Sequence, residues 1–392
     1  MKDQKNIPAL RFPEFNGEWK NKKLGEIAEK IQDGTHFSPV VIEEGHYKYI
    51  TSKNIRNGYM DLSDISYISD IAHREIYRRC DVRLNDVLIT KDGASVGNVC
   101  LNELNEEFSL LSSVAFIRAN KAISQNDYIY QYIVSPTGQK EIQSFVSGQA
   151  ITRITLTKLN CFNISFPTLP EQKKIASFLT SVDTRLTQLK QKKNFLEQYK
   201  KGVMQKLFSR EIRFRYDEGM EFPEWEEKIL GDLVDYEQPT KYLVESTEYN
   251  ESFKTPVLTA GKTFILGYTD ETNGIFENNL PVIIFDDFTT ATQFVDFPFK
   301  AKSSAMKILL PKVGVNIKFI YEAIQVIKYE IGGHERHWIS KYSKIPILLP
   351  SYVEQTKIAN FLFSLDEKIN QCKSQIEKTE QWKKGLLQQM FC

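Results

Sequence analysis

Three short segments carry residue types that bind phosphate or metal ions in other proteins. Residues 260–263, Ala-Gly-Lys-Thr, have the ending of a Walker A loop, but the first glycine of that motif would fall at Pro256. Residues 334–337, His-Glu-Arg-His, are one residue short of the H-E-x-x-H spacing that places two zinc ligands on one helical face. Asp286 and Asp287 form a carboxylate pair without an obvious set of further ligands, and we expect them at a solvent-facing strand end. The sequence therefore shows no convincing active site or metal site.

A second group of residues could bind nucleic acid. They are basic, hydroxyl and amide side chains in Gly-containing loops, where Lys and Arg can contact phosphate oxygens and Asn and Gln can contact base edges. The candidates are Thr35, His36, Lys53, Asn54, Arg56, Lys91, Gln149, Arg153, Lys262, Thr263, His334, Arg336, His337 and Lys341. The alternative for any single member is an ordinary solvated surface. What favours nucleic-acid binding is that such loops recur in two different parts of the chain.

The chain contains two copies of two different segments, which a search for internal repeats reveals. Trp19–Ile27 returns in similar form as Trp225–Leu233, 206 residues later. Ile164–Ser209 returns as Ile347–Cys392, 183 residues later, with 20 identities in 46 aligned pairs. Arg153 and Arg336 occupy equivalent positions at this second offset. The two halves of the chain are therefore similar to each other at their ends and different in their middles.

The segments that end the two halves are predicted to be long helices. Thr168 and Ser351 each precede a Glu by three positions, which fits a capping box at a helix N-terminus. Apolar residues then follow at alternating spacings of four and three, a heptad stripe typical of coiled coils. The stripe residues are Ile175, Leu179, Val182, Leu186, Leu189 and Leu196 in the first helix, and Ile358, Leu362, Leu365, Ile369, Ile376 and Leu386 in the second. Because helices of ~40 residues, or ~60 Å, exceed what a small core covers, we expect them to pair as an antiparallel coiled coil; packing on separate cores is the alternative.

The two middles, residues 30–160 and 236–345, are rich in β-branched and aromatic residues with Gly, Asn and Asp between them. We expect an α+β fold, with two mixed globules separated by the two long helices. The expected domains are residues 1–166, 167–210, 211–349 and 350–392. The expected strands include Tyr47–Thr51, Asp86–Thr90, Val114–Arg118, Pro281–Phe285, Thr292–Phe297 and Met306–Leu310, and Asn126–Val134 and Phe319–Ile327 are expected to be helical.

Composition limits the class of protein. Lys and Arg number 51 and Asp and Glu 50, so the formal net charge is +1 and does not by itself indicate nucleic acid or membrane. Within the second middle, however, residues 298–346 carry 9 basic and 3 acidic groups, so one face of that globule can still be basic. Five cysteines without a C-x-x-C pair, a polar start and no long apolar run predict a soluble cytoplasmic protein.

Taken together, these motifs resemble the specificity subunits of type I restriction–modification systems. The resemblance covers nearly the whole chain. It rests on Leu24-Gly25 and Leu230-Gly231, the Pro-x-x-x-Glu-Gln-x-Lys-Ile-Ala-x-Phe-Leu openings at Pro167–Leu179 and Pro350–Leu362, the Lys-Lys-Gly endings at residues 200–202 and 383–385, and the Asp33–Pro39 segment. The second middle lacks the Asp-Gly-Thr-His tetrapeptide, which implies that it reads a different DNA half-site.

The resemblance implies a non-catalytic subunit that recognises DNA. Each middle would be a target-recognition domain that reads one half of a bipartite, asymmetric site in double-stranded DNA. The helices would space the domains and dock two modification subunits, which supply S-adenosylmethionine-dependent N6-adenine methylation, and ATP-dependent restriction subunits would join them. S-adenosylmethionine, ATP and Mg would be bound by these partners, with no cofactor, metal or membrane contact for this chain. The alternative function is a coiled-coil scaffold for protein partners without sequence-specific DNA binding.

Overall fold

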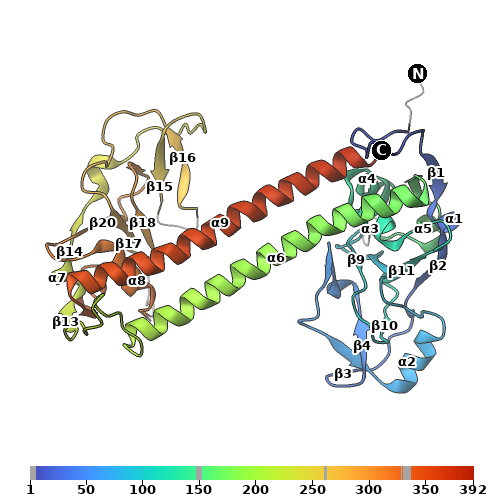
Figure 1. The fold of residues 1–392 in the computed structure, drawn as a ribbon, viewed down its shortest axis with the longest axis horizontal. Coiled ribbons are helices and arrows are strands. Elements are labelled where there is room, and N and C mark those ends of the chain that lie inside the picture. Colours follow the sequence, from blue (N-terminus) through green and yellow to red (C-terminus); the bar gives the residue numbers. More distant parts are fainter. Residues whose placement is uncertain (1–5, 147–151, 260–262, 328, 330–336) are drawn as a thin grey trace. The chain divides into compact units, whose positions relative to one another are not determined.

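The computed structural model describes residues 6–146, 152–259, 263–327, 329 and 337–392 (Figure 1). The chain divides into two compact units. Unit 1 comprises residues 1–190 and 374–392, and unit 2 comprises residues 191–373. Each unit therefore combines one of the expected globules with part of each long helix, whereas the sequence assigns globules and helices to separate segments.

Unit 1 is built on a four-stranded antiparallel sheet in the order β2-β11-β8-β9, called here its central sheet. A second sheet, β10-β4-β7-β3, packs on one face of it, and helix α3 on the other. The elements are β1 (Lys20–Lys23), α1 (Leu24–Ile27), β2 (Ala28–Asp33), β3 (Val41–Ile42), β4 (Tyr47–Ile50), β5 (Ile55–Arg56), β6 (Tyr59–Met60), β7 (Ser66–Ile68), α2 (Asp70–Tyr77), β8 (Val87–Thr90), β9 (Val99–Leu101), β10 (Ser109–Leu110), β11 (Val114–Ala119), α3 (Asn126–Val134), α4 (Pro136–Phe145), α5 (Leu156–Asn160), β12 (Asn163–Phe166) and the beginning of α6 (Leu169–Phe208).

The central strand β11 shows why this sequence forms a sheet that is covered on both faces. Its side chains alternate between the two faces, as the twofold period of a strand requires. Ala115 and Ile117 belong to the core that includes α3, whereas Val114 and Phe116 belong to the core under the second sheet. All of them are buried, which explains the continuous apolar run in the sequence.

Unit 2 repeats this plan with fewer elements. Its central sheet has the order β14-β20-β17-β18, and a smaller sheet, β16-β15-β19, packs against it. Ile283 and Phe285 of β17 face the core with α8, whereas Val282 and Ile284 face the core of the smaller sheet. The elements are β13 (Glu226–Ile229), α7 (Leu230–Leu233), β14 (Val234–Glu237), β15 (Thr255–Leu258), β16 (Ile265–Thr269), β17 (Val282–Asp286), β18 (Thr292–Val295), β19 (Lys300–Ala301), β20 (Met306–Pro311), α8 (Ile317–Gln325), β21 (Pro346–Leu349) and α9 (Tyr352–Met390), which ends in unit 1.

The two long helices pair in antiparallel fashion within each unit. In unit 1 the first part of α6 lies beside the last part of α9, and Asp183 Oδ1 is 2.5 Å from Lys383 Nζ. In unit 2 the last part of α6 lies beside the first part of α9, and Lys200 Nζ is 2.7 Å from Asp366 Oδ2. These two ion pairs are equivalent in the 183-residue repeat.

The heptad stripe is confirmed by burial. Its members are 0–8% exposed, apart from two that are partly buried, Leu196 and Ile376. The buried members are Ile175, Leu179, Val182, Leu186, Leu189, Ile358, Leu362, Leu365, Ile369 and Leu386. In the part of the chain that the structure describes, no helix combines the length and apolar character needed to cross a membrane.

The start of each long helix differs in one respect from the predicted capping box. The Ser351 hydroxyl accepts a hydrogen bond from the Glu354 amide at 3.4 Å, as expected for an N-cap. The Glu354 carboxylate, however, accepts hydrogen bonds from Trp225 Nε1 at 3.1 Å and from the Arg213 guanidinium at 2.9 Å. The prediction that this Glu turns back to its own helix terminus is therefore wrong, because a buried Trp and an Arg occupy its oxygens.

The same arrangement occurs in unit 1. Glu171 accepts hydrogen bonds from Trp19 Nε1 at 3.2 Å and from Arg11 at 2.6 Å. This hydrogen bond to Glu171 raises the pKa of Arg11. Each half of the repeat thus ties its Trp-containing opening to the start of its long helix.

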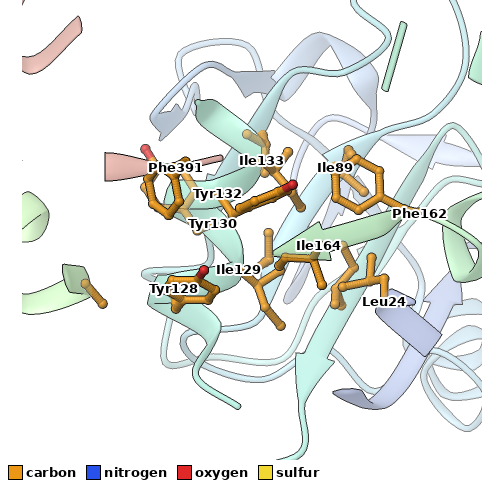
Figure 2. Packing of buried hydrophobic residues seen from close by; sticks show 14 of the residues in the cluster. Leu24, Ile89, Tyr128, Ile129, Tyr130, Tyr132, Ile133, Phe162, Ile164 and Phe391 are labelled. Carbon is orange, nitrogen blue, oxygen red and sulfur yellow. The ribbon is translucent and has the colours of Figure 1, made fainter. Parts of the chain in front are cut away.

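The end of each long helix completes an aromatic core. Figure 2 shows Phe391, which follows α9, beside Tyr128 and Tyr132 of α3, with ring centroids 5.8 and 5.5 Å away. In unit 2 the equivalent Phe208 of α6 lies 5.6 Å from Phe319 of α8. Aromatic pairs at these distances add to the area that they bury.

Candidate nucleic-acid interface

Several of the predicted DNA-contacting loops meet at one end of the central sheet of unit 1. Strands β2 and β8 both pair antiparallel with β11, so their carboxyl ends lie at the same edge. Asp33 ends β2, and Lys91 follows β8 directly. The amide of Lys91 donates to the carbonyl of Ser113, just before β11, at 2.9 Å. The backbone of these three strands therefore fixes the position of the loops.

A chain of ion pairs runs along this edge. Lys91 Nζ lies 3.4 Å from Asp33 Oδ2 and 3.1 Å from Asp92 Oδ2, and its side chain is 4% exposed. Arg153 Nε donates to Asp92 Oδ1 at 2.8 Å, while 52% of the Arg153 side chain faces solvent. His36 Nε2 lies 3.1 Å from Asp33 Oδ2 and is 58% exposed. The edge thus has a buried ionic interior and basic side chains on its outside.

The corresponding edge of unit 2 is built around a buried carboxylate. Asp287 follows β17, as Lys91 follows β8, and is 1% exposed. Its Oδ1 accepts a hydrogen bond from the amide of Trp338 at 2.9 Å, and its Oδ2 lies 3.4 Å from Lys307 Nζ. The expectation of a solvent-facing aspartate pair is therefore wrong for Asp287, because Lys307 and the Trp338 amide compensate its charge inside the domain.

The two edges correspond through their backbone. The amide of Ile154 donates to the carbonyl of Lys91 at 2.8 Å, and the amide of His337 donates to the carbonyl of Asp287 at 2.8 Å. Ile154 and His337 are 183 residues apart, the offset of the repeat. The segment that leads to each long helix therefore joins the same strand end in both units, although the side chains there differ in charge.

The structure divides the predicted DNA-contacting residues into three groups. The exposed group consists of His36, Lys53, Arg56, Arg153, Thr263 and Lys341. The buried group consists of Thr35, Asn54, Lys91 and His337. The group outside the described residues consists of Gln149, Lys262, His334 and Arg336.

Two further exposed cations lie on the 51–64 segment. Lys53 Nζ is 2.9 Å from Asp64, and Arg56 is 3.5 Å from Asp61. About half of each basic side chain remains exposed, at 46% and 47%. The amide of Ser52 in this segment donates to the Ser113 hydroxyl at 3.2 Å, which connects the segment to the strand edge of unit 1.

The buried candidates have structural roles instead. Asn54 donates to the carbonyls of Asp61 and Asp64 at 3.0 and 3.1 Å, so its amide cannot also read a base as predicted. The Thr35 hydroxyl accepts from the Phe37 amide at 3.2 Å and shapes the turn. His337 is fully buried, with Nδ1 3.1 Å from the Tyr329 hydroxyl. For these residues and for Lys91 a direct contact with DNA is contradicted by burial.

Sequence reasoning missed several charged residues of functional interest. Arg79 belongs to the strand edge of unit 1 but lies far from the predicted loops in the sequence, after α2. Lys307 lies within the buried strand β20, and the pattern of apolar residues in that strand does not indicate that this lysine forms an ion pair. The Asp286-Asp287 dipeptide is the one signal that could have marked the edge of unit 2.

A second charged cluster lies between the helices and each globule. In unit 1, Gln131 of α3 donates to Asp183 at 2.8 Å. In unit 2 the equivalent position of α8 is Glu322, and Lys200 Nζ donates to its carboxylate at 3.0 Å. Burial raises the pKa of Glu322 to about 7; Lys200 opposes the shift and Asp366 adds to it. Glu322 also borders a hollow of about 1170 Å³ in unit 2.

The described residues offer no cluster of three or more His, Cys, Asp or Glu side chains that could hold a metal ion. The sites that the chain does present are surface edges with ionic interiors. Such edges can contact a polyanion through their exposed basic side chains. The architecture is thus a duplicated α+β fold in which both long helices contribute residues to each unit.

Comparison with known proteins shows which proteins this chain resembles. Residues 16–198 match the family model described as the type I restriction modification DNA specificity domain. The chain is 26% identical over 412 aligned positions to the putative type I restriction enzyme MjaX specificity subunit of Methanocaldococcus jannaschii, covering 98% of this chain and 95% of that protein. The chain is thus similar to type I restriction–modification specificity subunits over almost its whole length.

Two further comparisons show the same similarity. The type I restriction enzyme EcoR124I/EcoR124II specificity subunit of Escherichia coli is 52% identical over 134 residues, which cover 32% of this chain and 33% of that protein. The crystal structure of a type I restriction-modification S subunit from M. genitalium matches 98% of this chain and 99% of its own, with a TM-score of 0.71 and 19% identity. Because the two sequences are only 19% identical, this structural match shows a similar fold and nothing beyond it.

Proposed function

We propose that this chain is the DNA-sequence recognition subunit of a type I restriction–modification complex. It binds a bipartite, asymmetric site in double-stranded DNA, one half with each unit, and performs no chemistry itself. It recruits two modification subunits, which methylate adenine at N6 with S-adenosylmethionine, and restriction subunits that use ATP and Mg. The chain requires no cofactor of its own and works in the cytoplasm.

The observation that carries the proposal is the duplicated strand edge. Ile154 and His337 make the same backbone contact in the two units, yet the buried group at the edge is Lys91 in one and Asp287 in the other. Equivalent scaffolds with different side chains are what two unlike half-sites require. The equivalent helix starts, with Glu171 and Glu354 in the same hydrogen bonds, suit two identical partner subunits.

The relatives support the recruitment of partners. One structure with a similar fold is described as revealing complex assembly and conformational transition of the type I system, with a TM-score of 0.50 and 13% identity. The curated relatives are named as specificity subunits of restriction enzymes. We extend the same assembly to this chain.

The test is methylome sequencing of a host that expresses this chain together with its modification subunit. We expect N6-methyladenine at a single motif made of two unlike half-sites with a fixed gap. The control strain expresses the modification subunit alone, and we expect it to lack this motif. A methylome that is the same in both strains, with the complex assembled, would favour a protein-interaction scaffold instead.

A further inference from the structure

Arg79 extends the strand edge of unit 1 at the end opposite Arg153. One Nη donates to the carbonyls of Gly34 and, at 3.4 Å, Asp33. The other Nη lies 3.6 Å from the Asp33 carboxylate. The Arg79 side chain is 49% exposed, close to the 52% of Arg153. Two half-exposed guanidinium groups are therefore anchored on the same strand edge.

The buried Lys91 connects the two arginines. Its ammonium group contacts Asp33, which holds Arg79, and Asp92, which holds Arg153. A buried ammonium is costly unless carboxylates compensate it, so both aspartates are drawn towards the interior. The result is a row of five alternating charges, with three cations and two carboxylates. Asp33 is 3% and Asp92 16% exposed, so the row presents mainly its arginines to solvent.

We propose that Arg79 and Arg153 form a phosphate-binding edge on the first recognition domain, which Lys91 positions through Asp33 and Asp92. The ligand is the sugar–phosphate backbone of duplex DNA beside the first half-site, and the proposal rests on the proposed function. Guanidinium groups suit this ligand because their planar donors match phosphate oxygens. Backbone contacts of this kind fix the register of a domain on the duplex without reading sequence.

The proposal is specific to unit 1. In unit 2 the buried centre is the carboxylate Asp287, whose oxygens face Lys307 and the Trp338 amide. Lys307 is 1% exposed and cannot reach a phosphate. We therefore expect the two half-sites to depend on different kinds of backbone contact.

The experiment measures how the affinity for the methylome-defined duplex depends on salt, using the complex of this chain with its modification subunit. Arg79→Ala and Arg153→Ala should each lower the slope of log K against log[salt] by ~0.9, and the double variant by about twice that. Arg83→Ala is the matched control. Arg83 is 62% exposed and paired with Asp81 at 2.8 Å, but it precedes the beginning of β8, whereas Lys91 follows its end. The salt slope of the Arg83→Ala variant should therefore stay at the wild-type value.

The outcomes separate the two proposals. If no bipartite methylation motif exists, the proposed function fails and this inference fails with it. If the motif exists but the double variant keeps the wild-type slope, the phosphate edge is refuted while the proposed function stands.

The positioning role of Lys91 needs a separate readout. Lys91→Met leaves Asp33 and Asp92 to be neutralised by the arginines alone, so affinity should fall about tenfold. Lys91→Met lowers the net charge of the row from +1 to 0, and adding Asp92→Asn returns it to +1 and should recover most of that loss, whereas a purely structural role would make the two losses add. If Lys91→Met does not fold, Lys91→Arg, which keeps the charge, should retain the wild-type salt slope; a slope as low as that of the double arginine variant would overturn the positioning role.

Discussion

Glu322→Gln should remove a pH dependence from unit 2. In the folded protein, burial raises the pKa of Glu322 from its ordinary 4.5 to about 7. The folded state therefore binds more protons than the unfolded state between about pH 4.5 and pH 7, and the free energy of unfolding falls as the pH rises through this window. Above about pH 7 Glu322 is ionised in both the folded and the unfolded state, and the free energy of unfolding falls no further from this cause.

The size of this effect follows from the shift. A pKa difference of this size corresponds to an upper limit of about 3 kcal/mol at ~1.4 kcal/mol per unit. Glu322 interacts with Lys200 and Asp366, and its carboxyl borders the hollow in unit 2, so we expect about 1–2 kcal/mol. At pH 8 the Gln variant should be more stable by this amount, and at pH 5 it should match the wild type.

The assay is hydrogen exchange of α8 amides at pH 5.5, 7.0 and 8.0, corrected for the intrinsic exchange rates. A change of ~1.4 kcal/mol alters protection about tenfold, which is readily measured. Unit 1 supplies the internal control, because Gln131 of α3 occupies the position of Glu322 beside Asp183 and Lys383. Gln131→Glu should give α3 the pH dependence that α8 has in the wild type. The reasoning is refuted if Glu322→Gln leaves the decline of α8 protection unchanged, or if wild-type α3 declines equally.

Four other predictions concern the exchange of one middle, the stability of unit 1, the length of the helices and the absence of catalysis. Replacing residues 236–345 by the middle of another specificity subunit should change one half of the methylated motif; a change in both halves in the methylome would contradict separate reading. Phe391→Ala should destabilise unit 1 by about 3 kcal/mol, measured as lost protection of α3, because the side chain fills the space beside Tyr128 and Tyr132. Four residues inserted between Lys193 and Asn194 add ~6 Å of helix, so the methylome should show a gap longer by one or two base pairs at ~3.4 Å each; an unchanged gap in an active variant would mean that the partners set it. The purified chain alone should show no methyltransferase, nuclease or ATPase turnover in standard assays, and activity in a partner-free sample would disprove the non-catalytic role.

The regular elements could be predicted from the sequence because their patterns are local. The structure forms helix α3 over Asn126–Val134, as predicted, and strand β11 over Val114–Ala119, one residue longer than predicted. The heptad stripe predicted the buried faces of both long helices. In these cases a period of two or of about 3.6 residues, with its terminating residues, decides the element.

The ionic interior of the strand edges could not be predicted in this way. Whether Lys91 or Asn54 faces solvent depends on strands that are distant in sequence, and Lys and Asn are exposed in most proteins. Asp33, Arg79 and Arg153 are connected through Lys91 and Asp92 across 120 residues of chain, and no local sequence pattern indicates this connection. Which candidate residues are exposed and which are buried therefore required the tertiary structure, and their contacts with DNA stay a prediction.

The place of Phe391 in the core of unit 1 has a consequence for synthesis on the ribosome. Unit 2 contains its helix-end aromatic, Phe208, near its own beginning, so its core can close as soon as its residues have emerged. Unit 1 must wait for residues 374–392, which follow the whole of unit 2. At ~5–20 residues per second this delay is about 10–40 s, during which the apolar surface around Tyr128 is uncovered. A nascent chain interrupted within unit 2 would thus carry an unfinished N-terminal domain, a ready substrate for chaperones and proteases.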